Sequence, residues 1–147
     1  MPPYVAVCGA SQADPAQQRA AEEVGRLLAE RGAVVLTGGY GGVMEAASRG
    51  ASQAGGTVVG ILPEETRAGA NPHLTVALAT GLGQARNAVI VTAADSVIAI
   101  GGGWGTLSEI GLARRLGRPV FALGSWELAG LETAGSPAEA VEKALGG

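Results

Sequence analysis

The sequence predicts an α/β fold: a doubly wound, mostly parallel sheet of Rossmann-like type, with helices on both faces and hence three layers. Three observations lead to this prediction. Short apolar runs alternate along the chain with stretches that repeat apolar residues at helical spacing. The apolar runs are nearly continuous, as in parallel strands buried on both faces. Three of them end in glycine-rich turns, where such sheets bind ligands. The length favours one domain over residues 1–147.

A strand and a helix open the chain. Residues 4–9, YVAVCG, form an apolar run that ends in glycine. Asp14 and Pro15 then provide an N-cap and a first-turn proline, and Gln17 stands at the capping-box position. We expect this helix to end at Gly32, because glycine commonly follows the last helical turn.

Residues 33–78 are predicted to form three strands, a helix and an irregular loop. Residues 33–37 (AVVLT) and 57–62 (TVVGIL) are predicted strands, and residues 43–54 between them are a predicted helix. Residues 63–72, PEETRAGANP, are polar and rich in turn-forming residues, which predicts a loop. Residues 74–78 (LTVAL) are expected to form a fourth strand.

The second half of the chain continues the alternation. Helices are predicted over residues 83–94, 107–117 and 136–147, and strands over residues 96–100 and 119–123. The connection from the fifth strand into its helix, GGGWGT, is the third glycine-rich turn.

Scarce residue types exclude several kinds of chemistry. Cys8, His73 and Lys143 are each the only residue of their type. A single cysteine forms no internal disulfide, and one cysteine with one histidine excludes a Cys-rich or two-histidine metal site. A pyridoxal phosphate Schiff base and a Walker A loop also lack a suitable lysine. We therefore expect neither a metal nor a resident cofactor.

Charge and hydropathy bear on partners and location. The formal net charge of −3 provides no basic surface for nucleic acid. The apolar stretch 87–103 is interrupted by Asp95 and by glycines, and it falls short of the roughly 20 residues of a spanning helix. The first residues lack the charged region of a signal peptide. We expect a cytoplasmic protein that binds neither nucleic acid nor membranes.

Two glycine phrases resemble each other. GGYGGVMEA begins at Gly38 and GGWGTLSEI at Gly102, and both fit Gly-Gly-aromatic-Gly-(Gly or Thr)-x-x-Glu. With CGAS after the first strand, they would lie along one edge of the sheet. Glycines let the backbone approach an anion, and helix N-termini attract phosphate through unpaired N–H groups. We predict a phosphate or nucleotide site formed by Gly9, Ser11, Gly38, Gly39, Gly41, Gly102, Gly103, Gly105 and Thr106.

A simpler alternative is that the glycines only permit tight turns between strands and helices. Neither phrase has the Gly-x-Gly-x-x-Gly spacing of dinucleotide-binding turns, so NAD is disfavoured as the ligand.

Glu109 has a structural interpretation beside a functional one. The stretch Thr106-Leu107-Ser108-Glu109 fits a capping box, in which Thr106 caps the helix and Glu109 bonds back to the cap. The first phrase has Gly42 at the equivalent position, with no side chain to offer. The two copies are therefore expected to differ at the start of their helices.

Other candidate side chains, like Glu109, allow both a structural and a functional interpretation. Arg86 lies near the start of its predicted helix, where the dipole disfavours a cation, so it is either a solvated surface residue or is held by an anion. Tyr40 and Trp104 would line a base-binding cleft or pack over the sheet edge. Cys8 and His73 are interpreted as structural or incidental.

The segment 84–110 resembles the signature of the Lonely Guy (LOG) family, in which an arginine-lysine pair precedes Pro-Gly-Gly-x-Gly-Thr-x-x-Glu. CGAS and TGGYGGVMEAA are similar to that family's first two glycine turns. Characterised LOG enzymes are phosphoribohydrolases, which release the base from cytokinin riboside 5′-monophosphates. The resemblance implies that Arg86 and Glu109 are catalytic, that the turn from Gly102 to Thr106 binds phosphate, and that the protein is a homodimer or larger homo-oligomer.

Two departures from the LOG signature stand out. Gly101 replaces the motif's proline, and Asn87 replaces its lysine. They point to a side branch of the wider SLOG superfamily, near molybdenum cofactor carrier proteins, which bind a pterin phosphate without cleaving it. Three functions stay open: a nucleoside 5′-monophosphate phosphoribohydrolase, a carrier of a nucleotide-like or pterin phosphate, and a nucleotide sensor. The lysine decarboxylase label once given to such relatives is disfavoured by the lack of a suitable lysine.

Overall fold

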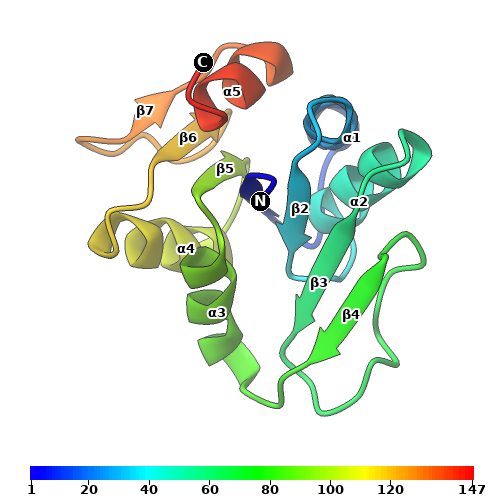
Figure 1. The fold of residues 1–147 in the computed structure, drawn as a ribbon. Helices are drawn as coiled ribbons and strands as arrows, with labels where there is room; N and C mark the ends of the chain where they lie inside the picture. The colour runs from blue at the N-terminus through cyan, green and yellow to red at the C-terminus, as the bar shows by residue number, and fades with distance from the viewer.

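One seven-stranded sheet organises the molecule (Figure 1). The computed structural model describes residues 1–147. The strand order is β4-β3-β2-β1-β5-β6-β7, and all neighbouring pairs are parallel. The strands are β1 (Tyr4–Gly9), β2 (Val34–Thr37), β3 (Val58–Leu62), β4 (Val76–Ala79), β5 (Ser96–Ile100), β6 (Val120–Leu123) and β7 (Glu132–Thr133). The helices are α1 (Pro15–Glu30), α2 (Val43–Gln53), α3 (Arg86–Ala93), α4 (Trp104–Arg115) and α5 (Pro137–Ala144), and the 3-10 turn η1 (Gly83–Ala85) precedes α3.

Helices cover both faces of the sheet. Adjacent residues of a strand point to opposite faces, so Val5 and Val7 pack in one core while Ala6 and Cys8 pack in the other. The first core also holds residues of α1, α2 and α5, and the second holds residues of α3 and α4. The predicted three-layer α/β fold with a parallel sheet is confirmed.

The strand order reverses beside β1. From β1 the chain moves outward through β2, β3 and β4, and it then returns to the other side of β1 with β5. Five residues of β1 pair in register with β5, from Val5 opposite Ser96 to Gly9 opposite Ile100. Because β2, β1 and β5 are neighbours, the three glycine turns that follow them lie at one edge of the sheet, as the sequence predicted.

Helices α1 and α2 cross at two glycines. A Cβ atom at Gly25 would overlap the backbone carbonyl of Ala47, and one at Gly50 would overlap the carbonyl of Glu22. Both overlaps are with backbone, which has no freedom to rotate away. The two helices therefore approach as closely as they do because each presents a residue without a side chain.

Several boundaries differ from the sequence prediction. Strand β7 was not predicted, because two residues form no recognisable periodic pattern. The strand expected over 74–78 is Val76–Ala79, an edge strand that is mostly exposed. The helix expected over 83–94 opens with the 3-10 turn, and the last helix stops at Ala144. The capping box of Asp14 and Gln17 in α1 is confirmed.

Helix α4 begins three residues before the predicted start at residue 107. Its N-cap is Gly103, so Thr106 lies inside the first turn and Glu109 one turn further on. The chain turns early because Gly101 and Gly102 both have positive φ angles, 57° and 121°. The predicted capping box between Thr106 and Glu109 is therefore wrong.

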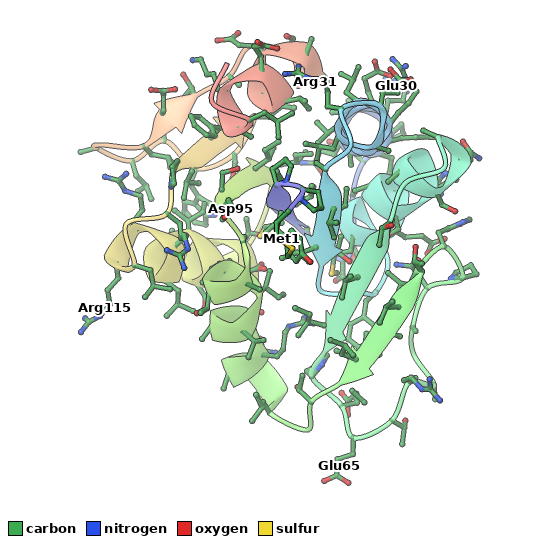
Figure 2. The ribbon with its side chains drawn as sticks, viewed as in Figure 1. Met1, Glu30, Arg31, Glu65, Asp95 and Arg115 are labelled. Atoms are coloured by element: carbon green, nitrogen blue, oxygen red, sulfur yellow. The ribbon has the colours of Figure 1, made fainter.

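Apart from the buried Arg86 and Glu109, the charged side chains are at least partly exposed. Figure 2 shows Glu30, Glu65 and Arg115 pointing away from the ribbon, and all three are exposed. None of the helices combines the length and the apolar character needed to cross a membrane.

Candidate functional site

A cavity of about 400 Å³ opens at the carboxyl ends of β1, β2 and β5, where the strand order reverses. Open α/β sheets bind their ligands at this place. The lining residues come from the end of β1 and its turn, the turn after β2 and the start of α2, the loop after β3, η1 and the start of α3, and the start of α4. They are Cys8, Gly9, Ala10, Ser11, Gly38, Tyr40, Met44, Pro63, Glu64, Gln84, Arg86, Asn87, Gly103, Gly105, Thr106 and Glu109.

Most of the residues predicted to bind a ligand line this one cavity. They are Gly9, Ser11, Gly38, Arg86, Gly103, Gly105, Thr106 and Glu109. Three others do not line it: Gly39, Gly41 and Gly102. Gly39 donates its N–H to the hydroxyl of Thr37. Gly102 lines a separate hollow that also includes Gln17 and Trp126.

Helix α4 points an uncapped N-terminus toward the cavity. Its N-cap, Gly103, forms no side-chain hydrogen bond to the helix, so the first-turn N–H groups at Gly105 and Thr106 are left for a ligand. Both residues line the cavity, and Thr106 adds a hydroxyl group while being only 3% exposed. An uncapped helix start with a hydroxyl beside it is suited to an anion such as phosphate.

The first glycine phrase does a different job. Helix α2 also lacks a side-chain cap at Gly42, but its first N–H group, at Val43, donates to the carbonyl of Ala10. Glu45 lies outside the cavity, and its carboxylate is 3.9 Å from the imidazole of His73. This phrase contributes Gly38, Tyr40 and Met44 to the cavity wall, and Gly38 makes room for an arginine.

Arg86 is buried and is held in place by the protein itself. Its Nη1 donates to the carbonyls of Gly38 and Ile61, both at 2.7 Å, and its Nε donates to Asn87 Oδ1 at 2.9 Å. A Cβ at Gly38 would lie 2.9 Å from Nη1, so a larger residue there would push the guanidinium away from its present position. The interpretation of Arg86 as a solvated surface residue is wrong. Backbone carbonyls hold the guanidinium at the cavity wall.

Glu109 is the buried carboxyl group of the cavity. It is 9% exposed, and the thiol of Cys8 donates a hydrogen bond to its Oε2 at 3.1 Å. Burial raises the pKa of Glu109 to about 7, against the opposing effects of the Cys8 hydrogen bond and the Arg86 charge. At neutral pH the group therefore exists in both protonation states.

The raised pKa of Glu109 makes stability depend on pH. The folded protein keeps the proton to higher pH than the unfolded chain does, so stability falls as pH rises from about 4.5 to about 7 and then levels off. The loss is on the order of 3 kcal/mol. Since glutamine does not ionise, Glu109→Gln is expected to escape this loss and to be the more stable protein at pH 8. Urea unfolding of both proteins at pH 5 and pH 8 checks this, and equal losses in the two would contradict it.

Of the two aromatic residues that the sequence suggested for a base-binding cleft, Tyr40 lines the cavity and Trp104 does not. Tyr40 lines the cavity, and its ring centroid lies 5.8 Å from the Arg86 guanidinium carbon. Trp104 does not line it: the residue is 80% exposed, and its ring lies against that of Trp126 with centroids 5.6 Å apart and a tilt of 38°. Tyr40 is thus placed to contact a ligand in the cavity, and Trp104 is not.

Sequence reasoning missed several lining residues. Cys8, interpreted as structural or incidental, contacts Glu109 directly. Asn87, noted only as a departure from the LOG signature, is 3% exposed and bonds Arg86. The position of Cys8 immediately before the first glycine turn was the available signal. Nothing in the sequence pattern indicated Glu64, which belongs to the turn-rich loop.

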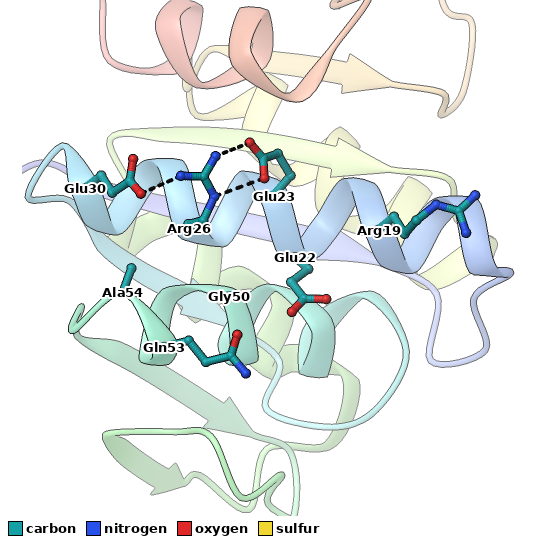
Figure 3. A pocket seen from close by; sticks show the side chains of 8 residues that line it. All are labelled: Arg19, Glu22, Glu23, Arg26, Glu30, Gly50, Gln53 and Ala54. Carbon is teal, nitrogen blue, oxygen red and sulfur yellow. Dashed lines mark hydrogen bonds and ion pairs between the residues drawn. The ribbon is translucent and has the colours of Figure 1, made fainter.

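A second hollow, of about 490 Å³, lies between α1 and α2 (Figure 3). Most of its charged side chains are already paired, since Arg26 forms ion pairs with both Glu23 and Glu30, and Glu22 lies 3.5 Å from Arg49. Seven of its eight lining residues are not hydrophobic. Arg19, which has no ion-pair partner, is exposed to solvent, so the cavity at the switch point is the better candidate site.

Comparison with known proteins identifies the family to which the chain belongs and several proteins similar to it. The model of the SLOG cluster4 family matches residues 2–144. An uncharacterized protein of Archaeoglobus fulgidus is 44% identical over 119 residues, which cover 81% of this chain and 78% of that protein. A rice protein (Oryza sativa subsp. japonica), the probable cytokinin riboside 5′-monophosphate phosphoribohydrolase LOGL5, is 37% identical over 107 residues. That match covers 70% of this chain but 44% of the rice protein.

Two solved structures share the fold over nearly the whole chain. The molybdenum cofactor binding protein of the phototrophic bacterium Rippkaea orientalis has a TM-score of 0.94 and 38% identity, covering 99% of this chain and 97% of that one. The molybdenum cofactor carrier protein of Chlamydomonas reinhardtii has a TM-score of 0.90 and 31% identity, covering all of both chains.

Proposed function

The chain belongs to the SLOG cluster4 family, and on this premise we propose that its switch-point cavity binds a small ligand through a phosphate ester and releases it unchanged, as a carrier does. The resemblance to LOG and molybdenum cofactor carrier proteins agrees with this family and with the relatives. The proposal depends on one observation above all. The uncapped start of α4 and the buried Arg86 side chain face a single cavity.

The cavity supplies the contacts that a phosphate group needs. The first-turn N–H groups and the Thr106 hydroxyl donate from α4, and Arg86 adds the positive charge. Three hydrogen bonds fix the guanidinium before any ligand arrives, so binding does not have to order it. These are properties of a binding site that is formed in advance.

A carrier role is supported by the relatives as well as by the site. Two structures that match this chain almost end to end are a binding protein and a carrier for the molybdenum cofactor. We therefore propose a pterin phosphate of this kind as the ligand class. Tyr40, at the cavity wall, is placed to stack on a flat ring.

A second candidate function is hydrolysis of a nucleoside 5′-monophosphate, favoured by the presence of Glu109 and Arg86 in the same cavity. The C1′–N bond would break with its electron pair leaving on the base, which takes up a proton, while water adds to C1′. An ionised Glu109 would stabilise the positive charge that develops on the ribosyl ring. A pKa of about 7 leaves part of the population in that form at neutral pH.

Two measurements on one preparation separate these functions. Protein purified from cells that make the molybdenum cofactor is denatured, and the released ligand is analysed by mass spectrometry. The same protein is incubated with a panel of nucleoside 5′-monophosphates, and free base is measured. We expect a bound pterin phosphate and no free base. Release of free base that Glu109→Gln abolishes would instead establish the hydrolase.

A further inference from the structure

The thiol of Cys8 and the carboxyl of Glu109 meet inside the candidate site. Cys8 lies near the end of β1 and Glu109 in the middle of α4, 101 positions apart in the chain. Cys8 is 1% exposed and Glu109 is 9% exposed, and both line the cavity. The Sγ–Oε2 distance of 3.1 Å is short for a bond that involves sulfur, so this is a close contact between two chemically active groups.

Glu109 is poorly provided with hydrogen bonds for a buried carboxyl group. Oε2 accepts from Cys8, and no other side-chain or backbone donor of the protein reaches the carboxyl group. A buried carboxylate ordinarily accepts several hydrogen bonds. The second oxygen, Oε1, is therefore left to find a donor in the cavity, from water or from a ligand.

We propose that Cys8 is a positioning residue: its thiol holds Oε2 of Glu109 so that Oε1 faces the cavity and accepts a hydrogen bond from a donor group of the bound ligand. The part played by the ligand rests on the proposed function. The link between Cys8 and Glu109 does not, because it exists in the protein alone. The ligand class is thereby narrowed to phosphate esters that also carry a hydroxyl or N–H group.

The electrostatic surroundings agree with this role. Burial and the neighbouring Glu109 carboxylate both raise the pKa of Cys8, so the thiol keeps its proton and acts as the donor. The other charged or titratable groups that line the cavity are Arg86 from α3, Glu64 from the loop after β3, and Tyr40 from the turn after β2. Of these, Arg86 acts on Glu109 by favouring the carboxylate.

The test compares Cys8→Ala, which removes the donor, with Cys8→Ser, which replaces it by a hydroxyl group. The titration of Glu109 is followed by NMR of protein labelled at glutamate carboxyl carbons, and its signal is identified by its loss in Glu109→Gln. In Cys8→Ala we expect Glu109 to become a roughly tenfold weaker acid, so that its titration moves to higher pH. In Cys8→Ser we expect the titration to stay near that of the wild type. Unchanged titration in both variants would overturn the proposal, whatever their unfolding temperatures.

Ligand binding is measured on the same three proteins with ribose 5-phosphate. We expect binding to weaken about tenfold in Cys8→Ala and to be retained in Cys8→Ser. If no protein binds ribose 5-phosphate while the titration moves as expected, the proposed phosphate-ester site fails and the Cys8–Glu109 link stands. If all three bind equally and the titration does not move, the role of Cys8 fails and the binding function stands.

A reciprocal measurement covers the case in which Cys8→Ala does not fold. Cys8 is the only cysteine, so no other thiolate contributes to the ultraviolet absorbance, and the tyrosine contribution is removed by subtracting the same titration of Cys8→Ser. Because the Glu109 carboxylate raises the pKa of Cys8, Glu109→Gln is expected to lower it, and the thiolate forms at lower pH than in the wild type. Thiolate formation at the same pH in both proteins would overturn the proposed link.

Discussion

Replacing Arg86 by methionine is expected to destabilise the protein by roughly 3 kcal/mol. The change leaves the buried carbonyls of Gly38 and Ile61 without the donor they share, and each unsatisfied group costs about 1–3 kcal/mol. Methionine keeps much of the length and volume of the side chain, so the loss reflects hydrogen bonds and charge more than packing. The free energy of unfolding, measured by urea denaturation, checks this prediction.

A matched control is available on α4. Arg115 is exposed at the end of that helix, and Arg115→Met is expected to change the stability by no more than about 0.5 kcal/mol (Figure 2). If Arg86→Met lost no more stability than Arg115→Met, the carbonyl contacts would not matter for the fold. The Arg86 guanidinium would then not be held by the carbonyls of Gly38 and Ile61, and the proposal of a binding site formed in advance would fail.

Replacing Gly50 by alanine is expected to cost about 3 kcal/mol of stability or more. The new Cβ would overlap the backbone carbonyl of Glu22, so α1 and α2 must move apart at their crossing point. Alanine normally stabilises a helix relative to glycine. Here that gain should be smaller than the loss of packing free energy, because the backbone of Glu22 cannot move aside without moving the helix. Urea denaturation measures the difference in the free energy of unfolding.

Gly111→Ala is the control for this change. Gly111 lies in the interior of α4 with no atom within 4 Å of the position of its added Cβ, so the variant is expected to gain about 0.5–1 kcal/mol. If Gly50→Ala and Gly111→Ala both raised or both lowered the free energy of unfolding, the close crossing of α1 and α2 would be contradicted.

The fold could be predicted because its strands are nearly continuous apolar runs. The predicted strands 4–9 and 96–100 have the same first and last residues as β1 and β5. The three glycine turns on neighbouring strands predicted a ligand site at the sheet edge, where the cavity lies. Strand β7 escaped prediction because it has two residues, and its position depends on pairing with β6. The roles of Gly25 and Gly50 depend on how two helices cross, which no local pattern contains.

The sequence predicted part of the lining of the candidate cavity, but not the contacts between its residues. Glu109 matched a capping box, yet the positive φ angles of Gly101 and Gly102 start the helix earlier and leave the carboxyl group for the cavity. Arg86 was expected to face solvent or an anion, and it binds carbonyls from two other strand ends. Contacts of this kind join residues that are distant in the chain, such as Cys8 and Glu109, and only the folded arrangement reveals them.

Binding of a phosphate ester where the uncapped start of α4 meets Arg86 is tested by titrating ¹⁵N-labelled protein with ribose 5-phosphate and following the backbone amide and arginine Nε–H signals by NMR. We predict saturable shifts of the Gly105 and Thr106 amides and of the Arg86 Nε–H, and no such shifts with ribose. Saturable shifts confined to other parts of the protein, or identical responses to ribose and ribose 5-phosphate, would contradict the claim.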